Sequence, residues 1–261
     1  MKSIKKAIKD LPVIGGLAKL VYRLIKPENI YFSSYWIDKY IPNEPITIVQ
    51  IGSNDGIRGD PIYQLVKKNK LWNVLFVEPV PYIFERLENN YGDEPRFKYE
   101  NSAINEDGTN QFFYSIDKEA FDKIPNLSED YNQIGSFYKE QVQKLSEGLV
   151  DEFIVETEVN CITLSELFNK NGIVSLEAFL VDAEGYDWKI LSQLRLNQFK
   201  PNLIVFEYLN LEESERKEAI NYLKKDYYIF SFRIDFLCIR KDKIKPKDLS
   251  ALKEKRINEK Q

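Results

Sequence analysis

The stretch that decides the fold is TIVQIGSNDG, Thr47 to Gly56, in which an apolar run stops at a glycine and continues into a polar loop. The run from Ile46 to Ile51 is nearly continuous in apolar residues and rich in β-branched ones, which predicts a strand buried on both faces. Gly52 and Gly56 then predict a tight turn with positive φ angles, which residues with a Cβ rarely adopt. On these residues alone, an ordinary strand-to-helix turn stays open as an alternative.

A helix and a second strand follow the loop. Asp60 and Pro61 fit the N-cap and first position of a helix with a lysine-rich last turn. LWNVLFV, residues 71–77, predicts a second buried strand that ends at Glu78, because Pro79 cannot continue the hydrogen-bonded ladder. This order is that of a strand, a crossover helix and a parallel strand, so we expect Glu78 to lie beside the glycine loop.

Glu78 is a candidate for binding a nucleoside. A carboxylate at the end of the second strand, beside a glycine loop after the first, typically accepts hydrogen bonds from both ribose hydroxyls. A solvated acid at a strand end is the alternative. The loop differs from a dinucleotide fingerprint, since Asn54 stands in place of the second glycine and Asp55 would repel a pyrophosphate. A ligand with a cationic end, such as S-adenosylmethionine, fits this charge.

Four further segments extend the pattern along the chain. They are FVEPVP at Phe76 to Pro81, ENSAI at Glu100 to Ile104, FLVDAEGYD at Phe179 to Asp187, and NLIVFE at Asn202 to Glu207. Together with IGSNDG, these segments resemble the FkbM-like family of S-adenosylmethionine-dependent methyltransferases, over roughly residues 45–240. The combination of FVEPVP with D-x-E-G-Y-D is more specific than any one motif alone.

The resemblance implies a doubly wound, Rossmann-like α/β methyltransferase sheet of seven strands with the last strand antiparallel. It implies transfer of a methyl group from S-adenosylmethionine to a hydroxyl, often on a sugar. The residues implied to bind this cofactor are Gly52, Ser53, Asn54, Asp55 and Gly56 at the methionine end, Glu78 with Pro79 at the ribose, and Asn101 with Ser102 at the adenine. Asp182 and Glu184 are implied to face the reaction.

Asp182 and Glu184 are the candidate catalytic residues. Methyl transfer mainly requires alignment of the reacting atoms, but an alcohol acceptor must also lose a proton. We expect Glu184 or Asp182 to accept it, because each carboxylate raises the pKa of the other. Asp182 is also a candidate to hold the ammonium of the cofactor, which leaves Glu184 as the base. As the alternative, both acids only cap a helix that starts near Tyr186.

The composition excludes several classes of site. The chain has no histidine, which excludes a histidine base, a histidine metal ligand and a Ser-His-Asp triad. Cys161 and Cys238 lie far apart in apolar runs, so we expect buried, reduced thiols, a cytoplasmic protein and no zinc site. A magnesium ion held by Asp182, Glu184 or Glu207 is not favoured, because nothing in their spacing requires one.

The chain length predicts one catalytic domain. Its 261 residues, 43% of them hydrophobic, can bury one full core, and the order of the motifs predicts a single catalytic domain at 41–242, with a variable acceptor-side insertion at 117–152. Residues 1–40 form a separate N-terminal segment, and 243–261 a charged, solvated C-terminal tail. The formal net charge of −4 disfavours nucleic acid as a partner, because binding it depends on neutralising phosphates.

Residues 1–26 form a basic amphipathic segment with no apolar run long enough to span a membrane. Two roles stay open for it. One is attachment to the anionic inner face of a membrane, and the other is packing on the domain itself or on a partner. Neither role requires a cleaved signal sequence, which the short apolar run does not favour.

Other elements and alternatives complete the prediction. Thr163 and Glu166 form a capping box that starts a helix, and Tyr227–Phe232 with Asp235–Arg240 predict a final antiparallel pair. The insertion contains the aromatic residues Tyr131, Phe137 and Tyr138. Burial in the core of the insertion is the favoured role for them, and packing against a sugar ring is the alternative. The functional rivals are a non-catalytic scaffold in a membrane-associated glycan assembly complex and an NAD-dependent sugar oxidoreductase.

Overall fold

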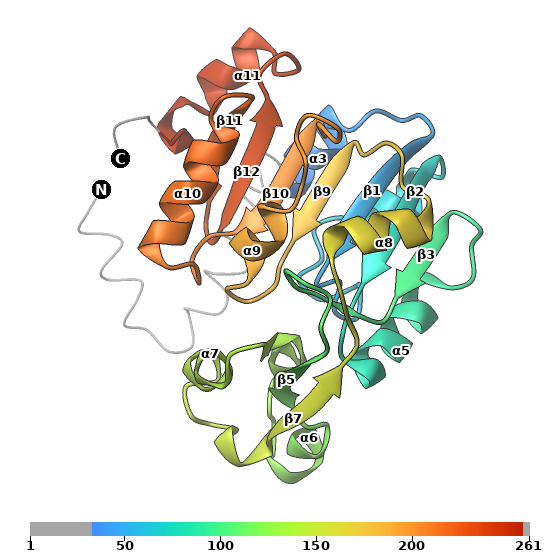
Figure 1. Cartoon of the computed structure of the whole chain (residues 1–261), viewed down its shortest axis with the longest axis vertical. Helices are drawn as coiled ribbons and strands as arrows, with labels where there is room; N and C mark the ends of the chain where they lie inside the picture. The colour runs from blue at the N-terminus through green and yellow to red at the C-terminus, as the bar shows by residue number, and fades with distance from the viewer. Residues whose placement is uncertain (1–32, 258–261) are drawn as a thin grey trace, which may run out of the picture.

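The centre of the protein is one seven-stranded sheet (Figure 1). The structure is a computed structural model and describes residues 33–257. The strands of the sheet are β1 (Ile46–Ile51), β2 (Trp72–Val77), β3 (Phe97–Glu100), β9 (Ala178–Val181), β10 (Leu203–Glu207), β11 (Tyr227–Phe232) and β12 (Asp235–Arg240). Their order is β11-β12-β10-β9-β1-β2-β3, and β12 runs antiparallel to both of its neighbours. The predicted seven-stranded sheet with an antiparallel last strand is confirmed.

Helices cover both faces of the sheet, so the fold is doubly wound. The helices are α3 (Ser33–Tyr40), α4 (Tyr63–Lys68), α5 (Pro81–Tyr91), α8 (Leu164–Asn171), α9 (Asp187–Leu191), α10 (Glu213–Leu223) and α11 (Pro246–Ala251). The helices α8, α9 and α10 share one apolar core with the near face in Figure 1, while α3, α4 and α5 pack on the other face. Among the residues that the structure describes, no helix is both long enough and apolar enough to span a membrane.

An inserted subdomain lies beyond the carboxyl edge of the large sheet, at the bottom of Figure 1. It contains a three-stranded sheet in the order β6-β5-β7 and several short helices. These elements are β5 (Gln111–Ile116), α6 (Glu119–Lys123), η2 (Glu129–Gln133), β6 (Gly135–Ser136), α7 (Lys139–Leu145), η3 (Asp151–Phe153) and β7 (Ile154–Val159). A small parallel pair joins it to the sheet domain, formed by β4 (Ala103–Ile104) and β8 (Cys161–Ile162). The subdomain has its own apolar core and includes the predicted insertion at 117–152.

Two details of the sequence prediction need correction. The helix after the glycine loop begins at Tyr63 and not at Pro61, although the Oδ1 of Asp60 accepts the N–H groups of Ile62 and Tyr63, at 2.6 and 3.1 Å, as an N-cap side chain does. The described part of the predicted C-terminal tail, residues 243–257, packs on the domain rather than being solvated. In α11, Asp248 pairs with Lys39 at 2.6 Å, and the short helix η4 (Lys253–Lys255) follows the buried Leu252.

Other local predictions hold. The capping box of Thr163 and Glu166 begins α8 as predicted. Cys161 and Cys238 are free and buried, which confirms the expected reduced thiols. The predicted roles of residues 1–26 lie outside the described residues.

Gly52 follows β1 at the point where the ends of β1 and β9 come closest. Its φ is +73°, and a Cβ at this position would lie 1.7 Å from the backbone oxygen of Asp182, closer than real contacts allow. Its N–H also donates to the carbonyl of Val77 at 3.0 Å, which ties the loop to the end of β2. The ends of β1, β2 and β9 can meet here because glycine at position 52 has no side chain.

We expect Gly52→Ala to lower the free energy of unfolding by roughly 3 kcal/mol, since it adds a steric clash to the strain of a left-handed residue. Gly148→Ala is the matched control, because Gly148 has a φ of +74° with no atom within 4 Å of the added Cβ. Gly148→Ala should lower the free energy of unfolding by only about 1 kcal/mol, because it adds the strain of a left-handed residue without a steric clash. Urea denaturation measures both. Equal losses would show that the contact with Asp182 is not a constraint.

Candidate active site

Acidic residues form a row across the carboxyl edge of the sheet. Asp235 is the register partner of Glu207, and Asp182 directly follows β9, the next strand. On the other side of β1, Glu78 directly follows β2. Gly52 occupies the position of the row between Asp182 and Glu78. The row therefore has one gap, at Gly52, where there is no side chain. The gap lies next to the pair β1 and β9, where the direction of chain winding reverses, and ligands typically bind at such a point.

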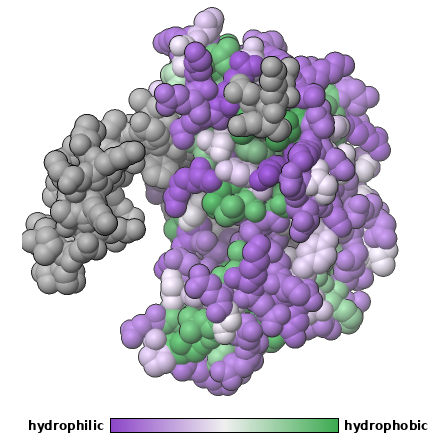
Figure 2. Space-filling view, turned by 90° about the vertical axis from the view of Figure 1, so that its left-hand side faces the viewer, coloured by the Kyte–Doolittle hydropathy of each residue, from purple (hydrophilic) through white to green (hydrophobic). Residues whose placement is uncertain are grey.

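A cavity of about 260 Å³ lies over this row. The sheet domain supplies its floor, and the inserted subdomain contributes Phe113, Asn132 and Phe137 to its wall. The cavity is therefore shared by the two parts of the fold. The left-hand face of the molecule is mostly hydrophilic, with exposed apolar side chains in separate patches (Figure 2).

The glycine loop is fixed to β2 by Ser53. Its N–H donates to the carbonyl of Val77 at 3.0 Å, and its Oγ accepts the N–H of the same residue at 3.2 Å. The following residue, Asn54, has a φ of +48° and donates its N–H to Oε2 of Glu78 at 3.0 Å. The loop and the end of β2 therefore form one hydrogen-bonded unit that lines the cavity.

Glu78 links the glycine loop to the start of α5. Its other oxygen, Oε1, accepts the N–H of Val80 at 3.0 Å. Burial raises its pKa to about 7, although the two backbone donors oppose this shift. Each carboxylate oxygen has a second lone pair, so Glu78 can still accept hydrogen bonds from a ribose.

Three of the predicted cofactor residues lie outside the cavity lining. Asp55 turns its carboxylate to its own loop, where Oδ1 accepts the N–H groups of Ile57 and Arg58 at 2.9 and 3.0 Å. Gly56 packs against α5 instead. Asn101 donates from its side chain to the backbone carbonyl of Glu78 at 2.8 Å. The carboxylates that line the cavity are therefore those of the acidic row, while Asp55 forms an Asx turn outside the lining and acts on Glu78 only through its charge.

The other predicted site residues do line the cavity. They are Gly52, Ser53, Asn54, Glu78, Pro79, Ser102, Asp182 and Glu184. Ser102 is fully buried and donates its hydroxyl to Glu100 at 2.9 Å. Their individual roles toward a cofactor stay predictions.

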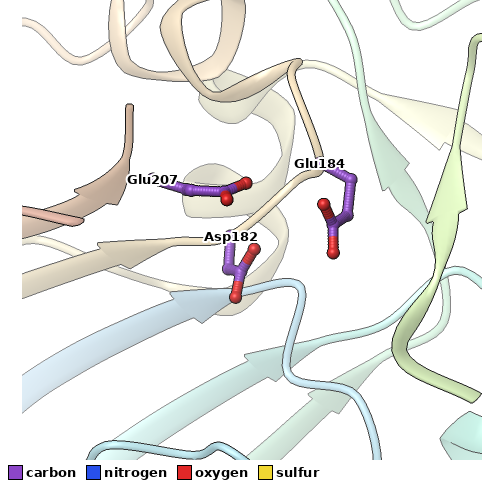
Figure 3. Close-up of side chains that lie close together, drawn as sticks. All are labelled: Asp182, Glu184 and Glu207. Carbon is purple, nitrogen blue, oxygen red and sulfur yellow. The ribbon is translucent and has the colours of Figure 1, made fainter. Parts of the chain in front are cut away.

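Asp182, Glu184 and Glu207 converge at the ends of β9 and β10 (Figure 3). One oxygen from each carboxylate lies within 4.8 Å of the others. The Nδ2 group of Asn210 donates to Glu184 and to Glu207, at 2.9 Å in each case. Oxygen ligands in this arrangement suit a cation, whether the positive end of a ligand or a magnesium ion. The prediction that magnesium is not required stays a prediction.

Burial raises the pKa values of these acids. Removal from bulk water raises the pKa of Asp182 to about 6 and that of Glu207 to about 7. Burial also raises the pKa of Glu184 well above its ordinary range, and the charges of Asp182 and Glu207 add to the shift. Glu184 has a φ of +47°, an uncommon backbone conformation for a glutamate that Asn210 helps to hold. A carboxyl group with a raised pKa suits a proton acceptor near neutral pH.

Asp187 is an essential part of this geometry, although the sequence analysis assigned it no role. It is fully buried, and its Oδ2 accepts the N–H groups of Ala183 and Gly185, both at 3.3 Å. Its Oδ1 accepts the N–H of Glu207 at 3.2 Å, which connects the loop after β9 to β10. The alternative in which Asp182 and Glu184 cap the following helix does not hold, because the N-cap of α9 is Tyr186 and it has no side-chain cap hydrogen bond.

Gln50 carries a second signal that sequence reasoning missed. It is a polar side chain in the buried part of a mainly apolar strand, only 5% exposed, and it lines the cavity. Its Oε1 is buried and has no hydrogen-bond partner among the residues that the structure describes. Because buried polar atoms are nearly always paired in native proteins, this oxygen indicates a donor supplied by a ligand.

The charge of the cavity fits S-adenosylmethionine. Among residues 33–257, no lysine or arginine forms an ion pair with Glu78, Asp182, Glu184 or Glu207. A ligand with an ammonium and a sulfonium group compensates this unpaired negative charge. The Gly52 gap leaves room for it beside the acids.

Sheet order, glycine loop and acidic row together define an S-adenosylmethionine-dependent methyltransferase. The family model described as the methyltransferase FkbM domain matches residues 50–238. The chain belongs to this FkbM methyltransferase family. The predicted resemblance is confirmed.

Solved structures with a similar fold are also methyltransferases. Human methyltransferase-like protein 13, in a complex with SAH, is 8% identical, with 87% of this chain and 85% of that chain covered and a TM-score of 0.40. A SAM-dependent methyltransferase from Aquifex aeolicus is 10% identical, with 85% and 96% covered and a TM-score of 0.39. Precorrin-6y C5,15-methyltransferase from Geobacter metallireducens is 7% identical, with 80% and 88% covered and a TM-score of 0.39. A search of the curated proteins gave no match.

We expect the affinity for S-adenosylmethionine to rise by about tenfold between pH 5.5 and pH 8. The acids of the row bind protons below pKa values of about 6 to 7, and only their ionised forms attract the sulfonium. S-adenosylhomocysteine, which lacks the sulfonium charge, is the matched control and should show a smaller rise. Isothermal titration calorimetry at several pH values measures both ligands. The same pH dependence for the two would contradict the assignment of the acidic row to the sulfonium.

Proposed function

We propose that the protein is an O-methyltransferase that methylates a hydroxyl of a sugar in a glycan or glycolipid. The observation that carries this proposal is the placement of Glu184, a carboxyl group with a raised pKa, in the cavity beside the glycine loop. An alcohol is a weak nucleophile until a base removes its proton, and Glu184 supplies that base. Bound S-adenosylmethionine supplies an electrophilic methyl group.

The acidic row supports a hydroxyl acceptor over other acceptors. An amine beside Asp182, Glu184 and Glu207 would be held as an ammonium ion, which has no free electron pair to attack a methyl group. A phosphate or carboxylate near the reacting atom would be repelled by the same side chains. A neutral hydroxyl meets neither obstacle, and it can donate its hydrogen to Glu184.

The chain's own residues divide the work in this mechanism. Gly52 and Asn54 hold the methionine end of the cofactor, and Glu78 holds its ribose. Asp182 stabilises positive charge, so that Glu184 is left to accept the proton of the acceptor hydroxyl. Asn210 keeps Glu184 in place through its hydrogen bond. Most of the rate enhancement comes from this positioning, because the reaction needs the acceptor oxygen in line with the methyl group.

The inserted subdomain supports an acceptor site above the acids. Phe137 lines the cavity, and its ring packs 4.8 Å from the ring of Tyr186. Tyr131 packs into the core of the subdomain, as the favoured interpretation expected. Tyr138 is 41% exposed and accepts a hydrogen bond from Lys189 at 2.9 Å. Of the three aromatic residues, Phe137 alone is thus suited to contact an acceptor inside the cavity.

We expect Glu184→Gln to lower the methyl-transfer rate at least 100-fold, because the amide accepts no proton. The affinity for S-adenosylhomocysteine should stay within about threefold, since the substitution preserves shape. Glu213→Gln is the control, because Glu213 pairs with Lys217 on the exposed surface of α10. Mass spectrometry of a panel of glycans and lipid-linked glycans, and calorimetry, measure the two effects. Unchanged turnover in the variant would remove Glu184 from the base role.

The same measurements, with NAD added as a second ligand in the calorimetry, separate the rival functions. A protein that binds S-adenosylhomocysteine but methylates no acceptor fits the non-catalytic scaffold. A protein that binds NAD in its place fits the oxidoreductase, which Asn54 disfavours because its side chain occupies the position of a fingerprint glycine.

We further propose that residues 1–26 bring the enzyme to the inner face of a membrane, where lipid-linked glycans are available. Deletion of these residues should abolish co-sedimentation with vesicles that contain an anionic lipid, since each basic residue contributes about 1 kcal/mol at such a surface. Vesicles of phosphatidylcholine alone serve as the control. Equal co-sedimentation of the intact and shortened chains would contradict the membrane role.

A further inference from the structure

We propose that the turn between β11 and β12 is an acceptor subsite, in which Asp235 binds a second hydroxyl of an uncharged sugar ring and Ile234 packs against its C–H face. This inference rests on the proposed function and names the chemistry of the acceptor. It assigns to these residues a role that neither the motifs nor the glycine loop indicated.

Asp235 lies at the opposite end of the acidic row from Glu78. It pairs in register with Glu207, and both Asp235 and Ile234 line the cavity. The predicted ribose contact at Glu78 and the positive charge of the cofactor, which we expect at Asp182, would take up the other end of the row. The space that remains beside Glu207 and Asp235 is therefore left for the acceptor.

The turn is held rigidly by Tyr208. The Tyr208 N–H donates to the carbonyl of Ile234 at 2.9 Å, and its hydroxyl donates to the carbonyl of Arg233 at 3.0 Å. The same hydroxyl also lies 2.9 Å from the Ser231 hydroxyl, and the ring stacks on Phe236 with a centroid distance of 4.1 Å. A side chain on such a turn is preorganised, so it loses little conformational entropy when it binds a ligand.

The Asp235 carboxylate has no partner of its own. Within residues 33–257 its side chain makes no hydrogen bond and no ion pair, and Arg233 on the same turn attracts it only from a distance. Burial, followed by the charge of Asp182, raises its pKa to about 7. An ionised carboxylate only accepts hydrogen bonds, so it needs donors, which sugar hydroxyls supply.

The surrounding charge selects a neutral ring. Asp182, Glu207 and Asp235 would all repel the carboxylate of a uronic acid or the phosphate of a sugar phosphate placed between them. Ile234, which is 43% exposed, adds an apolar surface next to the carboxylate. Hydroxyls on one edge and C–H groups on one face are the features of a neutral hexose or deoxyhexose.

The test uses saturation-transfer NMR on the full chain in the presence of saturating S-adenosylhomocysteine. The probes are a panel of neutral methyl hexosides and methyl deoxyhexosides, each hexoside measured beside the methyl glycoside of its uronic acid. We expect at least one neutral glycoside to bind, and its uronic acid counterpart to bind at least fivefold more weakly. Asp235→Asn should weaken the neutral glycoside at least fivefold and leave the affinity for S-adenosylhomocysteine within twofold.

Two further variants make the result specific. Asp242→Asn is the matched control, because Asp242 follows β12 at its far end and pairs with Arg240. It should leave glycoside binding unchanged. Ile234→Ser changes an exposed side chain without altering charge and should weaken the glycoside about threefold.

Binding of S-adenosylhomocysteine without binding of any neutral glycoside would overturn the subsite, as would equal binding of the uronic acid or an unchanged Asp235→Asn variant. Failure to bind S-adenosylhomocysteine at all would overturn the proposed function, and the subsite with it. Thermal unfolding of each variant confirms that its fold is intact.

Discussion

The site depends on the close approach of two strand ends at Gly52. A Cβ at this position would overlap the backbone oxygen of Asp182, so the junction of β1 and β9 exists only with glycine there. The same absence of a side chain opens the gap in the acidic row between Asp182 and Glu78. One steric constraint thus accounts both for the close contact of these strand ends and for the gap in the acidic row, which lies where ligands typically bind.

Charge is the second feature that organises this edge. Asp182, Glu184 and Glu207 repel one another, and hydrogen bonds from Asn210 together with the backbone contacts of Asp187 hold them close in spite of this. The raised pKa values of these acids mean that keeping all three carboxylates ionised at this site is unfavourable. A cationic ligand reduces this free-energy penalty, because it interacts favourably with the ionised carboxylates. The free protein is therefore matched to a positive cofactor before any acceptor arrives.

The sequence predicted those parts of the fold that depend on neighbours along the chain. The apolar runs gave the strands, and the capping box gave the start of α8. Gln50, Asn210 and Asp235 were missed as site residues, because their roles come from strand register and from loops far apart in the chain. Asp55 was assigned to the ligand from its charge and from the family resemblance, but its carboxylate accepts hydrogen bonds from a local turn. Local patterns thus predict elements, while the orientation of a polar side chain depends on its competing partners.

The inserted subdomain is connected to the chemistry through the glycine loop itself. Asn54 donates from its side chain to the carbonyl of Asn132 in η2 at 3.2 Å, and Tyr82 at the start of α5 donates to the Asn132 side chain at 3.1 Å. Arg58, on the same loop, pairs with Asp130 at 3.2 Å. The wall that the inserted subdomain contributes to the cavity is therefore tied directly to the glycine loop. These contacts couple two segments that lie far apart in the sequence, so the shape of the cavity depends on the packing of the subdomain against the loop.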